Sequence, residues 1–124
     1  IKNINFLGEK TPDEIAKLMN TSRLLIMASS FEGLPRVLIE SGLCGLPSIA
    51  TNIQGIRFPF GEDGGTIIYS ENDSDEFIDK ISNFHKNTTL QKEAGEKSLE
   101  LCSKLSGENM FRNNWIELAE RLYE

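Results

Sequence analysis

A chain of 124 residues, of which 39% are hydrophobic and 26% charged, has an ordinary globular composition and is long enough for one domain or part of one. Its formal net charge is −6 and its lysines and arginines are scattered, which argues against nucleic acid or an anionic membrane as a partner of this segment. No apolar run approaches the ~18 residues of a membrane span, so we expect no transmembrane helix.

Short apolar runs alternate with amphipathic segments along the chain, which predicts a parallel sheet covered by helices. A first strand is predicted at residues 4–7. A helix should follow, because Thr11-Pro12-Asp13-Glu14 combines a capping box with a proline at the first helical position. The inner face of this helix is predicted to consist of Ile15, Leu18 and Met19. The continuous apolar run 24–28 has the length of a strand that is buried on both faces.

The middle of the chain predicts a second helix and two further strands. The helix should run from Pro35 to about Cys44 and end at Gly45, a natural residue for a helix terminus. Strands are predicted at 48–51 and 66–69. Between them, residues 52–65 are rich in glycine and contain a proline, which predicts one long loop; such loops are usually functional or mobile.

The last part of the chain is predicted to be helical. Asp73-Ser74-Asp75-Glu76 should open a helix, and two more are predicted at about 88–105 and 108–123. The predicted inner face of the first of these helices consists of Phe77, Ile78, Ile81 and Phe84. Cys44 and Cys102 form neither a C-x-x-C motif nor part of a histidine cluster, so we expect two buried reduced thiols, in keeping with a cytoplasmic protein.

The segment 31–40 places two carboxylates, Glu32 and Glu40, eight residues apart on either side of a predicted helix start. The amides of Arg36 and Val37 should point out of that start, where unpaired donors and the helix dipole favour an anion such as phosphate. Glu40 should lie ~7.5 Å further along the axis, five residues after the proline. Carboxylates there could accept hydrogen bonds from sugar hydroxyls on both sides of a diphosphate, as in a nucleotide-diphosphate sugar. On spacing alone, a loop glutamate and a surface glutamate on an ordinary helix are the more frequent explanation.

The surrounding residues favour the functional interpretation. The run from Ser29 to Asn52 closely resembles the donor-site signature of retaining glycosyltransferase family 4, roughly S-x-F-E-G-L-P-x-V-L-L-E-A-M-A-x-G-L-P-V-V-A-T-D. The likeness extends to Phe6-Leu7-Gly8 and to residues 64–68, so it covers about residues 4–70. One departure is at residues 54–58, where the common G-G-x-x-E reads Q-G-I-R-F and has lost one glycine and the glutamate.

The resemblance implies an α/β fold with a Rossmann-like parallel sheet flanked by helices, similar to the second half of the C-terminal domain of a GT-B enzyme. Residues 1–124 would then be a partial nucleotide-sugar-binding domain that lacks the N-terminal acceptor domain and the first strands of its own domain. In the order 3-2-1-4-5-6, the strand at 4–7 would be strand 3, separated from strand 4 by a gap. We therefore expect it to shift beside the second strand, to pair with another chain or to be poorly ordered.

The resemblance also implies roles for individual residues. Glu32 would be the catalytic-site carboxylate: it would contact hydroxyls of the transferred sugar and be the carboxylate nearest the reacting carbon. Glu40 would bind the ribose hydroxyls, and residues 9–11 would hold the base, mostly through their backbone. The donor-binding residues implied in this way are Gly33, Leu34, Arg36, Val37, Glu40 and Lys10.

By resemblance the reaction is retaining transfer of a sugar from the nucleotide-diphosphate donor to an acceptor hydroxyl, in cell-surface glycan synthesis and without a bound metal or cofactor. The acceptor would be a saccharide or a lipid-linked saccharide, and the enzyme cytoplasmic or on the cytoplasmic face of the membrane. Peripheral membrane association through the N-terminal domain and oligomerisation through an exposed sheet edge both stay open. The isolated chain is expected to be inactive. Two alternatives remain: a sugar-nucleotide epimerase or phosphorylase on the same scaffold, and a non-catalytic α/β nucleotide-binding module.

Overall fold

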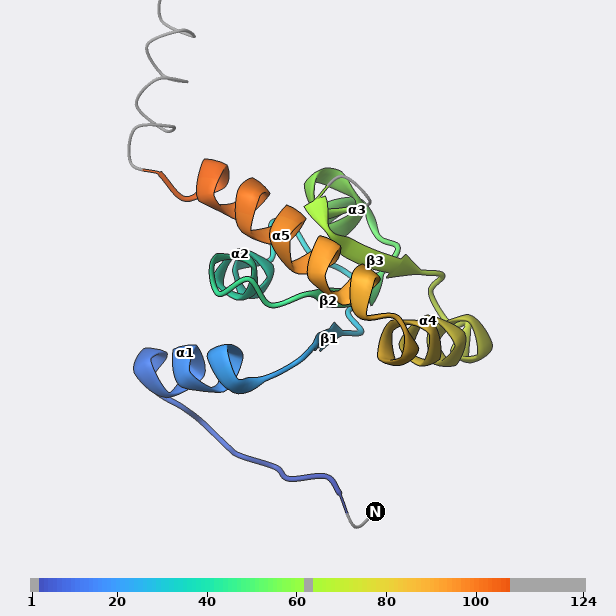
Figure 1. Ribbon diagram of the computed structural model, residues 1–124, viewed down its shortest axis with the longest axis horizontal. Helices are drawn as coiled ribbons and strands as arrows, with labels where there is room; N and C mark the ends of the chain where they lie inside the picture. The colour runs from blue at the N-terminus through green and yellow to red at the C-terminus, as the bar shows by residue number, and fades with distance from the viewer. Residues whose placement is uncertain (1–2, 62–63, 108–124) are drawn as a thin grey trace, which may run out of the picture.

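The computed structural model describes residues 3–61 and 64–107 of the chain. In this part, three parallel strands form one sheet in the order β1-β2-β3, namely β1 (Leu25–Met27), β2 (Ser48–Thr51) and β3 (Thr66–Tyr69). The helices around them are α1 (Pro12–Thr21), α2 (Arg36–Leu43), α3 (Gln54–Phe60), α4 (Ser74–Lys86) and α5 (Thr88–Leu105) (Figure 1). The predicted α/β class is confirmed, and the helix predicted at 108–123 lies outside the described residues.

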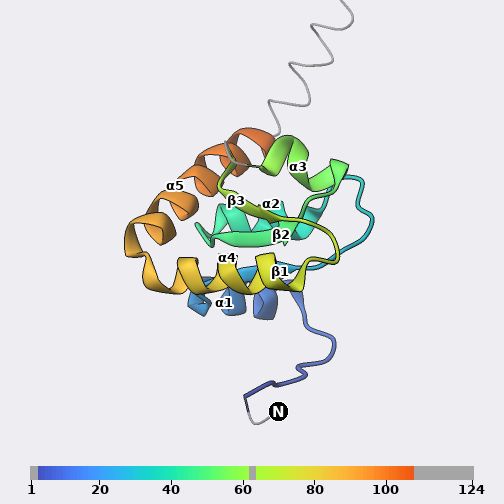
Figure 2. The same cartoon turned by 90° about the vertical axis from the view of Figure 1, so that its right-hand side faces the viewer.

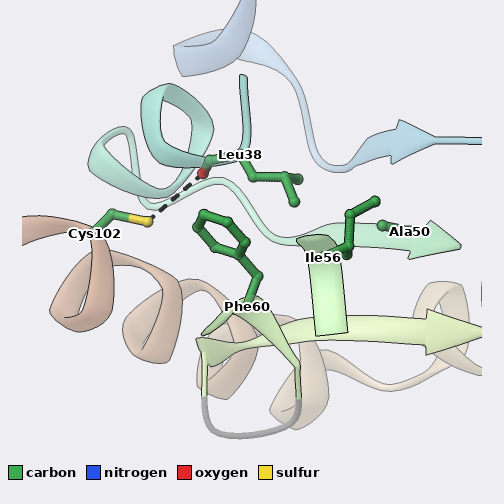
Figure 3. Packing of buried hydrophobic residues seen from close by; sticks show 5 residues of the cluster. All are labelled: Leu38, Ala50, Ile56, Phe60 and Cys102. Carbon is green, nitrogen blue, oxygen red and sulfur yellow. Dashed lines mark hydrogen bonds between the residues drawn. The ribbon is translucent and has the colours of Figure 1, made fainter. Parts of the chain in front are cut away.

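Helices cover both faces of the sheet, and β2 is buried at every position between them (Figure 2). On one face, α2, α3 and α5 enclose a core cluster of Leu38, Ala50, Ile56, Phe60 and Cys102 (Figure 3). On the other face, α4 brings Phe84 against Ile49 of β2 and Tyr69 of β3. A strand that is apolar on both sides is what a parallel sheet between two helical layers requires.

Local sequence signals set several helix ends as predicted. Thr11 Oγ1 accepts a hydrogen bond from the Glu14 amide at 3.4 Å, and the Glu14 carboxylate accepts one from the Thr11 amide at 2.9 Å, so the capping box is present. At the end of α2, Gly45 has a φ of +66°, and its N–H donates to the Gly42 carbonyl at 2.8 Å. Glycine adopts this left-handed conformation without a steric cost, which is why the helix ends there.

The prediction of a loop over 52–65 is wrong, because residues 54–60 form α3. Ile56 and Phe60 lie one turn apart, and their side chains are 0% and 1% exposed. Burying two such side chains stabilises the fold by about 1.5–3 kcal/mol each, which offsets the unfavourable helix propensities of glycine, about 1 kcal/mol, and proline, about 3 kcal/mol. Pro35 also differs from the prediction, since it is the cap that precedes α2, with a ψ of 106°, and Arg36 is the first helical residue.

The strand predicted at residues 4–7 is absent from the structure. These residues form no strand and do not join β1, so the prediction that this segment shifts beside the second strand is wrong. Pairing of this segment with another chain stays untested.

Several apolar side chains predicted to be inside are exposed. Ile26 of β1 is 47% exposed, because within the described residues β1 pairs with β2 alone and α4 packs over β2 and β3. Leu18 and Ile78 are likewise exposed on the outer sides of α1 and α4.

The two cysteines are both free thiols, as predicted, but only one of them is buried. Cys102 is 1% exposed and its Sγ lies 3.6 Å from the Leu38 carbonyl, to which it donates (Figure 3). Burial raises the pKa of this thiol, which makes it a packing residue rather than a nucleophile. Cys44 is half-buried at the end of α2.

Candidate functional site

The carboxyl ends of the three parallel strands meet at one edge of the sheet, where ligands of open α/β sheets bind. The turn from β1 to α2 crosses this edge, and the start of α3 faces it. Together they enclose a hollow of about 620 Å³, called here the Glu32 hollow, which is lined by Ser30, Phe31, Glu32, Gly33, Ile53, Gln54 and Gly55. Helix α3, which the sequence predicts as part of a loop, therefore forms one wall of the site.

Glu32 is half-buried in this hollow and held by one hydrogen bond. The Ser29 hydroxyl donates to Glu32 Oε1 at 2.8 Å. The second oxygen, Oε2, accepts no hydrogen bond from any residue that the structure describes. One carboxylate oxygen is thus fixed by the protein, and the other is free for a hydroxyl of a ligand.

The start of α2 offers open backbone donors, as the sequence predicts. The amides of Gly33, Leu34, Arg36 and Val37 donate to no acceptor within residues 3–61 and 64–107, and the first amide of this turn that is satisfied is that of Leu38. Four neighbouring N–H groups at a helix start, together with the helix dipole, favour an anion. Within the described residues these amides are therefore open to a ligand.

Glu40 lies on α2 and lines a different hollow from Glu32. This second hollow, called the Glu40 hollow, has a volume of about 370 Å³ between α1 and α2, and its other lining residues are Pro12, Ile15, Ala16, Met19, Leu43 and Cys44. The Arg36 guanidinium lies 4.0 Å from Glu40 Oε1, and both side chains are largely exposed. The two carboxylates are thus not in one cavity: they border two hollows, and the open amides lie between them in the sequence.

The structure does not bring the Lys10 side chain to either hollow. Lys10 lines a shallow hollow of about 290 Å³ on the far side of α1, with Leu7 and Leu18 among its neighbours. Its Nζ is 3.5 Å from the Glu9 carbonyl. Only the backbone of residues 9–11 therefore stays a candidate for contact with a ligand near Glu40.

A further hollow, of about 380 Å³, lies at the same edge of the sheet and extends from Ser29 and Ser30 to the turn 71–74. At its base the Thr51 hydroxyl donates to the Tyr69 hydroxyl at 3.3 Å. Among the described residues no three His, Cys, Asp or Glu side chains are grouped so that they could hold a metal ion. Nor is any helix of the described segments both long and apolar enough to cross a membrane.

Comparison with known proteins gives consistent matches. The model of the family described as glycosyl transferases group 1 matches residues 1–100. A curated relative, the uncharacterized glycosyltransferase MJ1178 of Methanocaldococcus jannaschii, is 30% identical over 108 residues, which are 87% of this chain and 31% of that protein. Sucrose-phosphate synthase from Thermosynechococcus elongatus has a similar fold, with a TM-score of 0.83 at 18% identity over 98% of this chain and 31% of that one. The chain thus spans about a third of the length of each.

Proposed function

Because the chain belongs to the glycosyl transferases group 1 and has the fold of a GT-B domain, we propose that it binds the nucleotide-diphosphate sugar of a retaining glycosyltransferase. The observation that carries this proposal is the open turn 33–37, whose amides have no acceptor in the described chain and which adjoins Glu32. A diphosphate placed there accepts hydrogen bonds from the amides of Arg36 and Val37. These donors are fixed by α2, so they stabilise the charge of the leaving diphosphate without rearranging.

Glu32 is assigned to the transferred sugar. The Ser29 hydroxyl orients the carboxylate, and Oε2 accepts a hydrogen bond from a sugar hydroxyl. The amides of Gly33 and Leu34 bind the same sugar. A carboxylate held near the anomeric carbon also stabilises the positive charge that develops there as the bond to the diphosphate breaks.

Glu40 is assigned to the ribose, and the Glu40 hollow to the nucleoside. Both side chains of the Arg36–Glu40 ion pair are exposed, so the pair contributes about 0–1 kcal/mol. Glu40 can therefore exchange this pair for hydrogen bonds from ribose hydroxyls at little cost in free energy. Ile15 and Met19 supply apolar surface beside this carboxylate. The backbone of residues 9–11 lies at the start of α1 and is assigned to the base.

The remaining parts of the proposal are supported only by the resemblance to retaining glycosyltransferase family 4. The acceptor is the hydroxyl of a saccharide or a lipid-linked saccharide that is extended into a cell-surface glycan, in the cytoplasm or at the cytoplasmic face of the membrane. No metal or cofactor takes part. The chain supplies part of the donor domain, and the acceptor side comes from elsewhere in the complete protein.

The test is a titration of the complete protein with UDP and with GDP by calorimetry, followed by incubation with UDP-glucose and GDP-mannose. We expect one of the two nucleotides to bind and the sugar of the corresponding donor to be released or transferred. NMR of the first product should show the same anomeric configuration as in the donor. Turnover should be unchanged by excess EDTA. Binding of neither nucleotide contradicts the proposal and indicates a purely structural α/β module. Binding without release, transfer or epimerisation of the sugar favours the non-catalytic nucleotide-binding module, whereas epimerisation of the donor without release or transfer of the sugar favours the epimerase.

A further inference from the structure

The start of α3 packs directly against the backbone that carries Glu32. At Gly55, an added Cβ would fall inside the contact distance of the carbonyl oxygens of Glu32 and Gly33, and it would lie 2.7 Å from the carbonyl carbon of Glu32. These are backbone atoms, so no flexible side chain can move aside. Gly55 lies within helix α3 and is not among the described glycines with positive φ, so the position requires glycine for its lack of a side chain.

The turn that α3 supports has few other anchors. Apart from the hydrogen bond between Ser29 and Glu32, no hydrogen bond joins residues 30–34 to another described residue. By contrast, α3 is firmly placed, because Ile56 and Phe60 are fully buried in the core cluster (Figure 3). The position of the core is therefore transmitted to the turn through the contact at Gly55.

We infer that Gly55 is a positioning residue for Glu32: its bare α-carbon lets α3 support the Glu32–Gly33 peptide and so fixes the carboxylate toward the sugar. This inference rests on the proposed function of Glu32. The donor-binding amides of Arg36 and Val37 belong to α2, whereas the Gly55 contact is with the Glu32–Gly33 peptide that precedes this helix. Gly55 should therefore affect the chemical step and leave nucleotide affinity unchanged.

The size of the effect follows from the geometry. An alanine at position 55 forces the turn or the helix to move by roughly 1 Å to restore an ordinary contact, and a displacement of this size at a reacting group can lower the rate ~100-fold. We expect Gly55→Ala to lower kcat for the donor that is turned over, UDP-glucose or GDP-mannose, about 10- to 100-fold. The Kd of UDP or GDP should change less than about 2-fold.

A matched control is Gly95→Ala in the complete protein. A Cβ at Gly95 would lie 2.7 Å from the Gly45 carbonyl oxygen, so this variant also introduces a backbone clash, but at the opposite end of α2 from Glu32. Both variants should lower the melting temperature. Only Gly55→Ala should lower kcat, and equal kcat values for the two variants would overturn the inference.

A double variant separates positioning from a general loss of structure. If Gly55 acts through the carboxylate, then Gly55→Ala should lower kcat by less than about 2-fold in a Glu32→Gln background, because the group it positions is already gone. A full additive loss would mean that Gly55 acts elsewhere. If Glu32→Gln itself leaves kcat unchanged, the proposed role of Glu32 fails; if Glu32→Gln lowers kcat and Gly55→Ala does not, only the positioning inference fails.

Should Gly55→Ala not fold, a milder pair of variants decides. Ile56→Val and Ile49→Val each remove one methyl group from a side chain that is 0% exposed, and each costs about 0.5–1.5 kcal/mol. Ile56 anchors α3, whereas Ile49 lies on the opposite face of the sheet. A fall in kcat confined to Ile56→Val supports the inference, and equal kcat values contradict it.

Discussion

Phe60 should be the side chain on which α3 depends most. It is 1% exposed and packs in the core cluster with Leu38 and Cys102, so Phe60→Ala removes a fully buried ring and leaves a cavity beside α2 and α5. Changes of this type cost about 3–5 kcal/mol. A domain is typically stable by only ~5–15 kcal/mol, so the variant should lose a large part of its stability. Because α3 has no side-chain cap, we expect it to lose its structure before the rest of the domain does.

The assay is chemical unfolding of the complete protein, combined with hydrogen exchange of the peptide that contains α3. Exchange of the α3 amides should accelerate at least about 100-fold in Phe60→Ala, which corresponds to ~3 kcal/mol. The control is Ile78→Ala on α4, whose side chain is 57% exposed and whose truncation should cost less than about 0.5 kcal/mol. If Phe60→Ala lowers the free energy of unfolding by less than ~1 kcal/mol, burial of this side chain does not hold α3 in place.

Three further outcomes are expected. Glu32→Gln should lower kcat sharply, about 100-fold, whereas Glu40→Gln should mainly raise the donor KM, about 10-fold, in steady-state kinetics. Gly45→Ala should destabilise the domain by about 1–2 kcal/mol in thermal unfolding, because alanine is strained at a φ of +66°. The pKa of Glu76 is lowered by hydrogen bonds from the side chain and backbone of Ser70. Its contribution to stability is therefore complete above the ordinary pKa of 4.5 and is lost as the pH falls through the folded-state pKa. Glu76→Gln should flatten this part of the dependence of the unfolding free energy on pH, as chemical unfolding at several pH values would show.

Matched variants show which of these effects are specific. Glu96→Gln removes a carboxylate that, like Glu40, is exposed and paired with a cation four residues away, and it should leave the donor KM unchanged. Gly107→Ala adds a methyl group in open space and should cost little. Equal changes in kcat and KM for both Glu32→Gln and Glu40→Gln would contradict the separate roles assigned to them.

Local signals could be predicted from the sequence, and long-range packing could not. The capping box at Thr11, the helix end at Gly45 and the strand at 66–69 depend on neighbouring residues, so their patterns predict them correctly. Helix α3 depends on the burial of Ile56 and Phe60 by α2 and α5, segments that lie far away in sequence. A composition rich in glycine and proline predicts a loop there, because composition does not register burial.

The same division applies to the candidate site. The turn 33–37 and its open amides are a property of a helix start, and the sequence predicts them. Gly55 approaches Glu32 from a segment more than twenty residues away, and the sequence offers only the surviving glycine of a G-G-x-x-E pattern as a signal. The exposure of Ile26 could not be predicted either, since an apolar run predicts a buried strand whether or not a neighbour pairs with its edge.

The charges around the turn predict how weakly the isolated chain should bind. The start of α2 supplies the equivalent of about half a positive charge and contributes at most ~2 kcal/mol. The cation of this turn is Arg36, which is 88% exposed and pairs with Glu40, while the chain as a whole carries a net charge of −6. A diphosphate with a negative charge on each phosphate is therefore under-neutralised by the described residues, so we expect the cations that balance it to come from outside them. We expect the isolated chain to bind UDP or GDP no more tightly than about millimolar, equivalent to ~4 kcal/mol, and to transfer no sugar. Micromolar binding in calorimetry, or sugar transfer by the isolated chain, would refute this reasoning, because α2 and its open amides would then suffice for the donor.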